Sequence, residues 1–237
     1  TGTPSLRSIE WSSELSLFVV LTSDTVYTSP DGTTWSTGTS LPESAGWDNL
    51  VWAPGVGGSL GRFVAVSASS TKIMYSTDNT TSWTTVDVSG LSTTFYTGVA
   101  WSPELSRFVA GGPGGSVPSV IYSSDGISWL AGTPTKSTNS VVWAPSLGLF
   151  CGLRFTTADD VSQVSFDGID WTPSSGEQFG ENFNHLAWGS TVGKFAAVNG
   201  SGGPILESLD GVTWVSKENN GGNPFQNLSF ASDLRIF

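Results

Sequence analysis

The chain has 237 residues and a formal net charge of −11 at pH 7, with 9 Lys and Arg against 20 Asp and Glu. Such an acidic chain lacks the basic patches that nucleic acids and anionic membranes require, so we expect neither as a partner. A single Cys and a single His exclude a disulfide framework and a Cys/His metal cluster, and we expect no metal and no other cofactor.

From the N-terminus onward, a turn pattern recurs about every 45 residues. Its five copies occupy residues 29–35, 76–83, 123–129, 165–171 and 208–214, and four of them read Ser-x-Asp-Gly-x-x-Trp. The Asp carboxylate of such a turn can accept backbone N–H bonds, and glycine supplies a positive φ. We therefore expect a structural role for the aspartates of the turn, which are Asp31, Asp78, Asp125, Asp167 and Asp210.

Each repeat contains four short runs of β-branched and aromatic residues, which are typical of strands. The first strand ends in a Trp, the second begins at a Phe, the third precedes the turn, and the fourth begins at the Trp of the turn. No segment of helical length has an apolar period of 3.6, so almost no helix is expected. The repeat predicts an all-β protein, a β-propeller of four-stranded antiparallel blades, with the tryptophans of the first and fourth strands mostly buried.

The two ends of the chain do not complete a repeat. Residues 227–237 match the first strand and the start of the second strand of a sixth repeat, while residues 2–4 match residues 132–134, which follow a fourth strand. We expect residues 1–237 to form a single propeller domain with five blades. The alternative is that the chain belongs to a ring of six or more blades.

The Ser-x-Asp-Gly-x-x-Trp turns resemble the Asp-box, or BNR repeat, of sialidase-like and related propellers. The longer second copy has Thr80 where the family has Gly. The resemblance implies a propeller fold, and the pattern is most similar to propellers of phage tails and bacterial surface proteins. It therefore implies an extracellular location or display on a virion. Related propellers include glycosidases, lectins, assembly factors and sorting receptors, so the resemblance does not select one activity.

The residues that a sialidase of this family needs are missing. The resemblance would require three arginines from different blades, and only Arg7 and Arg154 lie at suitable positions. We therefore expect that the protein is not an enzyme. A glycoside hydrolase with a pair of carboxylates is the less favoured alternative. The acidic residues that could form such a pair are Glu43, Asp48, Glu177 and Glu181.

An aromatic residue followed by a polar residue recurs just before the first strands. In the first blade the corresponding residues are Leu6 and Arg7. An aromatic ring beside an amide or a carboxylate suits a sugar, because the ring stacks on C–H groups and the polar group binds hydroxyls. The alternative is that the aromatic caps the interface between blades. The candidate ligand-binding residues are Trp47, Asp48, Tyr96, Asn139, Phe183, Asn184, Phe225 and Gln226.

These observations lead to a functional expectation. The leading hypothesis is a non-enzymatic recognition module, displayed outside a cell or on a virion, that binds a cell-surface glycan or a host receptor. The alternative is a structural or protein-binding propeller, such as a virion decoration or an assembly scaffold within a larger complex.

Overall fold

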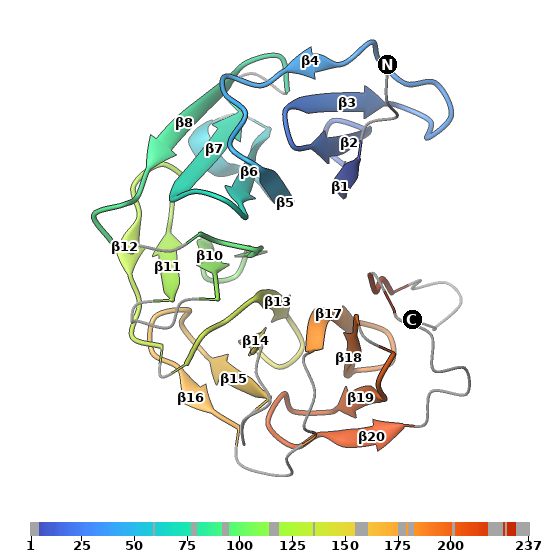
Figure 1. The fold of residues 1–237 in the computed structure, drawn as a ribbon, viewed down its shortest axis with the longest axis vertical. Helices are drawn as coiled ribbons and strands as arrows, with labels where there is room; N and C mark the ends of the chain where they lie inside the picture. Colours follow the sequence, from blue (N-terminus) through green and yellow to red (C-terminus); the bar gives the residue numbers. More distant parts are fainter. Residues whose placement is uncertain are drawn as a thin grey trace. The chain divides into compact units, whose positions relative to one another are not determined.

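A computed structural model describes residues 5–58, 60–76, 80–91, 95–113, 119–134, 136–154, 161–174, 179, 183–200, 202–217, 225 and 227–230. These residues form five four-stranded antiparallel sheets, each built from strands that are consecutive in the chain (Figure 1). The sheets are the blades of a β-propeller, as the repeat predicted.

The strand bounds follow the repeat. Blade 1 contains β1 (Leu6–Ser12), β2 (Leu17–Thr22), β3 (Thr25–Ser29) and β4 (Thr39–Ser40). Blade 2 contains β5 (Trp47–Pro54), β6 (Gly61–Ser67), β7 (Lys72–Ser76) and β8 (Trp83–Asp87). Blade 3 contains β9 (Gly98–Ser102), β10 (Arg107–Gly111), β11 (Val120–Ser123) and β12 (Leu130–Ala131). Blade 4 contains β13 (Ser140–Ala144), β14 (Leu149–Leu153), β15 (Ser162–Ser165) and β16 (Thr172–Pro173). Blade 5 contains β17 (Phe183–Gly189), β18 (Lys194–Asn199), β19 (Ile205–Ser208) and β20 (Val215–Lys217).

The chain divides into two compact units. The first contains residues 1–110 and 122–130, and the second contains residues 111–121 and 131–237, so blade 3 contributes residues to both. Helical structure in the described residues is limited to the 3₁₀ turn η1 (Val56–Gly58). Accordingly, no described helix has the length and apolar character to cross a membrane.

An aromatic stack fills the interior of every blade. The Trp that ends the first strand lies against the Phe that begins the second strand, with ring centroids 4.4–4.7 Å apart in all five blades. In blades 2, 3 and 5 the Trp of the turn packs on the same Phe at 6.2–6.4 Å. Each blade thus has its own apolar centre, formed by aromatic rings of its own strands.

The expectation that both sets of tryptophans are mostly buried holds for one set only. The turn tryptophans of blades 2 to 5 are 4–8% exposed, whereas Trp35 of blade 1 is 39% exposed. Among the first-strand tryptophans, Trp52 is buried, Trp11 is 42% exposed and the other three are half-buried. The first strand is an edge strand, so one face of its Trp lies on Phe while the rest reaches the boundary of the sheet.

The repeated turn, here named the Asp turn, has the same hydrogen bonds in four blades. In blade 3 the Asp125 carboxylate accepts the N–H groups of Ile127 and Ser128 at 2.8 and 2.7 Å. Ser123 Oγ accepts the Gly126 N–H at 2.8 Å and donates to Asp125 at 2.9 Å. Gly126 has a φ of +73°, a conformation that glycine adopts without strain. The same bonds surround Asp31, Asp167 and Asp210, and Asp78 lies outside the described residues.

These bonds stabilise the ionised carboxylates. For Asp125, partial burial alone would raise the pKa, but the N–H groups of Ser128 and Ile127 outweigh it and the pKa is lowered. For Asp31, the N–H groups of Thr34 and Thr33 hold the pKa far below its usual value. The Asp turns are therefore closed by local bonds that require a charged carboxylate.

Candidate functional site

The aromatic positions proposed as stacking platforms are interior positions. Trp47, Tyr96 and Phe183 are 0–1% exposed. A buried ring cannot offer a face to a ligand, so the structure corrects the prediction for these three residues and supports the alternative that they cap the blade interfaces. Phe225 is half-buried, and its N–H donates to the Asn199 carbonyl at 3.3 Å, while Gln226 lies outside the described residues.

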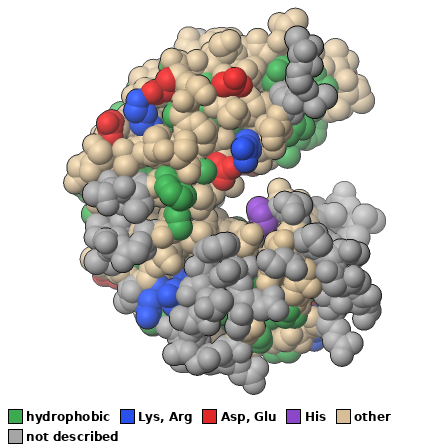
Figure 2. Space-filling view, viewed as in Figure 1, with side chains coloured by type: hydrophobic (Ala, Val, Ile, Leu, Met, Phe, Trp, Pro, Cys, Tyr) green, Lys and Arg blue, Asp and Glu red, His purple; other side chains and the backbone are tan. Residues whose placement is uncertain are grey.

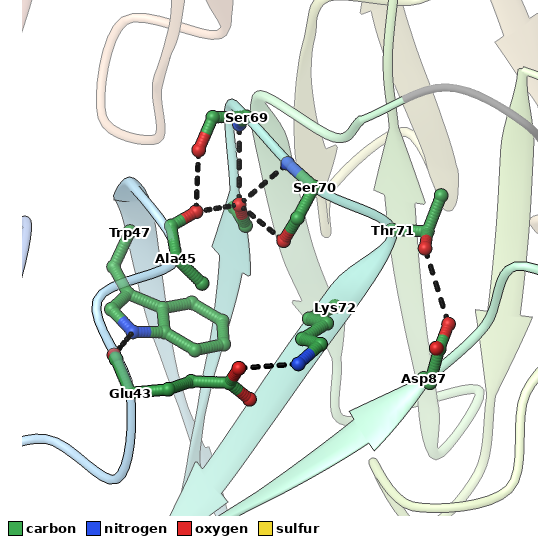
Figure 3. Close-up of polar contacts among 9 residues, drawn as sticks. Glu43, Ala45, Trp47, Ser69, Ser70, Thr71, Lys72 and Asp87 are labelled. Carbon is green, nitrogen blue, oxygen red and sulfur yellow. Dashed lines mark hydrogen bonds and ion pairs between the residues drawn. The ribbon is translucent and has the colours of Figure 1, made fainter.

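Figure 3 shows how the loop that carries Trp47 is held. The indole N–H of Trp47 donates to the Glu43 carbonyl at 3.0 Å, and the Glu43 carboxylate forms an ion pair with Lys72. Ser67 Oγ donates to the Ala45 carbonyl and accepts the N–H groups of two serines that follow it, at 3.2 and 3.0 Å. Lys72 lowers the pKa of Glu43, so this carboxylate is a structural anion rather than a proton donor. Glu177 and Glu181, the other predicted partners for an acid pair, lie outside the described residues.

The residue after the aromatic position lies in a β-bulge in three blades. Strand pairing skips one residue at the start of three first strands, between Leu6 and Ser8, between Trp47 and Asn49, and between Phe183 and His185. The skipped residues are Arg7, Asp48 and Asn184. A bulged residue is freed from the alternation of the strand and re-aims its side chain. In blades 2 and 5 the bulge therefore frees a polar side chain at the edge of the first strand, next to a ring that is buried.

Arg7 and Asp48 meet at this edge. Their side chains come from the adjacent first strands β1 and β5, and Arg7 Nη1 lies 3.7 Å from Asp48 Oδ1. The two side chains are 48% and 30% exposed, so water reaches both charges. A solvent-exposed pair at this distance is worth little to stability.

Glu10 lies further along β1 and reaches the open edge of β5. Phe63, the partner of Trp52 on β6, donates its N–H to Ser76 Oγ on the side of β7. In an antiparallel pair the Trp52 N–H must then point away from β6, toward the open edge. Glu10 Oε1 accepts this N–H at 3.3 Å. Burial raises the pKa of Glu10 to about 7, an effect that the Trp52 N–H only partly offsets.

Glu14, in the turn after β1, completes these contacts. Its Oε2 accepts the indole N–H of Trp52 at 2.7 Å, and this bond lowers the pKa of Glu14. Blade 1 thus accepts two hydrogen bonds from Trp52, one from its backbone N–H and one from its indole N–H. We name Arg7, Glu10, Glu14, Asp48 and Trp52 together the β1–β5 seam.

Sequence reasoning identified Asp48 and missed Glu10. The signal was present in the repeat, because the residue before the first-strand Trp is apolar in the next four blades, where it is Val51, Ala100, Val142 and Ala187. Glu10 is the one carboxyl among these five residues, and because apolar residues serve for packing in the other blades, it could have been singled out from the sequence.

The second unit has uncharged groups at the same repeat position. Asn139 and Asn184 are half-buried, and the Oδ1 atom of Asn184 is buried without a hydrogen bond. His185 is also half-buried, and the single histidine of the chain is visible in purple in Figure 2. Cys151 is fully buried, and burial raises the pKa of its thiol, so it is not a nucleophile. Within the described ranges, no three His, Cys, Asp or Glu side chains gather as metal ligands would.

Charged side chains are sparse on the face seen in Figure 2, where Lys, Arg, Asp and Glu are scattered among uncharged groups. Against this background the β1–β5 seam places two carboxyl groups on Trp52 and an ion pair between the first residues of the same two blades. It is the candidate functional site in the part of the chain that the structure describes.

No protein-family model and no curated protein matches the sequence. Solved structures match the fold. Virginiamycin B lyase from Staphylococcus aureus has a TM-score of 0.75 at 11% identity, over 93% of this chain and 72% of that one. A streptogramin B lyase structure has a TM-score of 0.78 at 9% identity, over 97% of this chain and 75% of that one. A GH74 enzyme from Niastella koreensis has a TM-score of 0.72 at 17% identity, over 94% of this chain and 38% of that one.

These similarities correct the functional expectation. The sequence led us to expect a non-enzymatic recognition module, whereas the propellers that share this fold are named as lyases and as a GH74 enzyme. The expectation of a non-enzymatic recognition module is therefore wrong, although the predicted fold is confirmed. At 9–17% identity the likeness establishes the propeller and transfers no activity to this chain.

Proposed function

We propose that the protein binds a small molecule that carries both a positive and a negative group, at the β1–β5 seam. The observation that carries the proposal is the Arg7–Asp48 pair. Two opposite charges lie 3.7 Å apart on bulged residues, and both side chains are partly exposed. The same repeat position holds uncharged Thr97, Asn139 and Asn184 in the other blades. A ligand with both charges could exchange with the pair, the guanidinium binding its anion and the carboxylate its cation.

A titration tests this proposal. Glycylglycine serves as the probe with both charges, and acetate and methylammonium as probes with one charge each, followed by NMR chemical shifts. We expect glycylglycine to bind at about millimolar affinity and the single charges to bind more weakly. Arg7→Gln and Asp48→Asn should each weaken binding without lowering the melting temperature.

Lys217→Gln, at an exposed position in the other unit, is the matched control and should leave binding unchanged. Equal binding of all three probes would contradict the proposal. So would undiminished binding by the Arg7 and Asp48 variants.

Acid–base catalysis at the same seam is a second candidate, and the Glu10 carboxyl favours it. A group with a pKa of about 7 can both donate and accept a proton near neutral pH. Incubation with short peptides, followed by mass spectrometry, tests for turnover. Glu10→Gln should abolish turnover and leave binding intact. The expectation that the protein is not an enzyme stays a prediction, and it survives if no peptide changes.

We also infer membership of the Asp-box propellers and a location outside the cell or on a virion. The support is the Asp turn, whose carboxylate bonds are the same in four blades. Detection of the protein in purified particles or in the culture supernatant, rather than in washed cells, tests the location.

A further inference from the structure

The fourth strand of blade 2, β8, is the longest outer strand that the structure describes. It has five residues, whereas the fourth strands of the other blades have two or three. Blade 2 lies wholly within the first unit, and its strands β5 and β6 contact β1, β2 and β9 of the same unit. In its own sheet β8 pairs with β7 on one side, and no described strand pairs with its other side (Figure 1). β8 is therefore the outer edge of a blade whose neighbours belong to the same unit.

The backbone groups on the outer side of β8 follow from its pairing. Val88, the residue after the strand, donates its N–H to the Thr71 carbonyl at 2.9 Å, so these two residues form a hydrogen-bonded pair. Hydrogen-bonded and other pairs alternate along antiparallel strands, so Val86 also bonds to β7, while the N–H and C=O groups of Thr85 and Asp87 point away from it. In the part of the chain that the structure describes, no hydrogen bond engages these outward groups.

Blade 4 supports this assignment. Pro173 and Thr85 hold the same repeat position, because each follows the Trp of its turn by two residues. Pro173 pairs with Gln163, and Thr85 pairs with the corresponding Met74. Proline has no N–H and occurs on edge strands where the N–H would face away from the sheet. The same position in blade 2 therefore carries an N–H that its own sheet does not use.

β8 lacks the features that protect the other outer strands. Short length, proline and lysine are the usual means by which an edge strand avoids pairing with another chain. Strands β4 and β12 have only two residues, β16 contains Pro173 and β20 ends in Lys217. β8 has the sequence Trp-Thr-Thr-Val-Asp, in which three of the five residues are β-branched. Such residues favour strand pairing, so this edge is suited to accept an additional strand.

The charges beside β8 indicate which strand fits. Asp87, the last residue of β8, is exposed, and its carboxylate accepts the Thr71 hydroxyl at 3.1 Å (Figure 3). It also accepts the Ser89 N–H at 2.9 Å, and this bond is the main cause of its lowered pKa. Lys72, opposite Asp87 on β7, is bound to the Glu43 carboxylate. A cation on an incoming strand would thus meet an ionised carboxylate whose neighbouring lysine is already paired.

The same charges argue against occupants from this chain. Opposite charges across a pair of strands attract, and like charges repel. A second copy would bring a further net charge of −11 to the acidic edge. The residues after blade 5, 218–237, are also acidic, with Glu218 and Asp233 against Arg235. A cationic segment of a different protein is the better complement.

We propose that β8 binds an extended cationic peptide segment of a partner protein, which adds to blade 2 as a fifth strand antiparallel to β8. The N–H and C=O groups of Thr85 and Asp87 pair with the main chain of the peptide. A Lys or Arg of the peptide lies directly opposite Asp87, and β-branched residues follow it along the edge. Because the ion pair is exposed, binding weakens as salt is added.

Amide hydrogen exchange, followed by NMR, tests the proposal. The probe is the peptide acetyl-Thr-Lys-Val-Thr-Val-Thr-amide, whose Lys lies opposite Asp87 in the antiparallel register. At a peptide concentration about ten times the dissociation constant, the amides of Thr85 and Asp87 should exchange about tenfold more slowly than in the free protein. The amide of Ser216, which holds the position of Thr85 in blade 5, is the reference and should not change.

Variants of the protein separate the main chain from the charge. Thr85→Pro copies the proline of blade 4 and removes an outward N–H, so it should keep the melting temperature and weaken binding about tenfold or more. Ser216→Pro is the matched control in blade 5 and should leave binding unchanged. Asp87→Asn should weaken binding of the Lys peptide and should not weaken binding of the same peptide with Gln in place of Lys.

Variants of the peptide give a test that does not depend on how the protein variants fold. A methyl group on the nitrogen of the central Thr removes a donor that faces β8 and should abolish binding. The same methyl group on the Val before it lies on the side away from β8 and should be tolerated. A peptide with Glu in place of Lys should bind about tenfold or more weakly.

Three outcomes would overturn the proposal. The first is equal binding of the two methylated peptides. The second is slow exchange at Thr85 and Asp87 without peptide that increases with protein concentration, which would show that a second copy pairs with β8. The third is slow exchange without peptide at every protein concentration, which would show that the chain itself covers the edge. None of these outcomes bears on ligand binding at the β1–β5 seam, which has its own test.

Discussion

Replacing Glu10 with Gln should change how stability depends on pH. The folded protein raises the pKa of this carboxyl from 4.5 to about 7, so folding favours the protonated form. The stability that the protonated carboxyl contributes is complete below the unfolded pKa and is lost as pH rises through about 7. Glutamine keeps an oxygen that can accept the Trp52 N–H and carries no charge at any pH.

The size of the effect follows from the shift. A raised pKa of this size corresponds to about 3 kcal/mol at about 1.4 kcal/mol per pH unit, and solvent screening of a half-buried side chain reduces it to about 2 kcal/mol. We therefore expect Glu10→Gln to match the wild type at about pH 4.5 and to exceed its free energy of unfolding by about 2 kcal/mol at about pH 8.5.

Urea unfolding at both pH values measures this difference. Other carboxylates also titrate, but they are common to both proteins and cancel in the comparison. A difference in the free energy of unfolding between Glu10→Gln and the wild type that is the same at both pH values would refute the raised pKa of the Glu10 carboxyl.

Three further predictions concern the Asp turns. Asp125→Ala should lower the free energy of unfolding by about 1–2 kcal/mol, because two N–H bonds to the carboxylate are lost. The wild type should lose a similar amount of stability when the pH falls through the lowered pKa of Asp125 and the carboxylate becomes protonated. Trp129→Ala should lower the free energy of unfolding by about 3–5 kcal/mol, and Trp35→Ala should lower it clearly less, because the two side chains are 7% and 39% exposed. Equal losses of stability in thermal unfolding would contradict this difference in burial. Gly126→Ala should destabilise by more than about 1 kcal/mol, from a positive φ and a Cβ 2.7 Å from Val64, and an unchanged melting temperature would speak against this packing.

The fold could be predicted from the sequence because the signal is repeated. Five copies of the turn recur along the chain, each preceded by a first-strand Trp and a Phe that lie 7 residues apart in four blades and 11 in the second, so together they locate strands that a single copy leaves ambiguous. The predicted strand starts are correct to within a residue in most blades. In blade 1 the fourth strand begins at Thr39 rather than at Trp35, because Ser36 bonds back to Thr28 before pairing begins.

The candidate site could be predicted only in part. The repeat shows that position 47 and its equivalents are aromatic, but burial depends on the neighbouring loop, and the Ser67 network that closes over Trp47 has no sequence signature. The raised pKa of Glu10 likewise depends on the strand of another blade, whose Trp52 N–H it accepts. Features set within a repeat were predictable, and features set between repeats were not.

The hydrogen bonds of the Asp turn have a consequence for the order in which the chain folds. In each described turn the carboxylate binds N–H groups only two or three residues away, so closing it costs little loop entropy. The pairing of consecutive strands is also local, which favours rapid formation of a blade. Seating a turn on the previous blade joins residues about 50–60 apart, such as Ser162 with Gly211 and Arg62 with Asp125, and this step comes later. The Asp turns would then form early, and their docking onto the previous blade would limit the rate of folding.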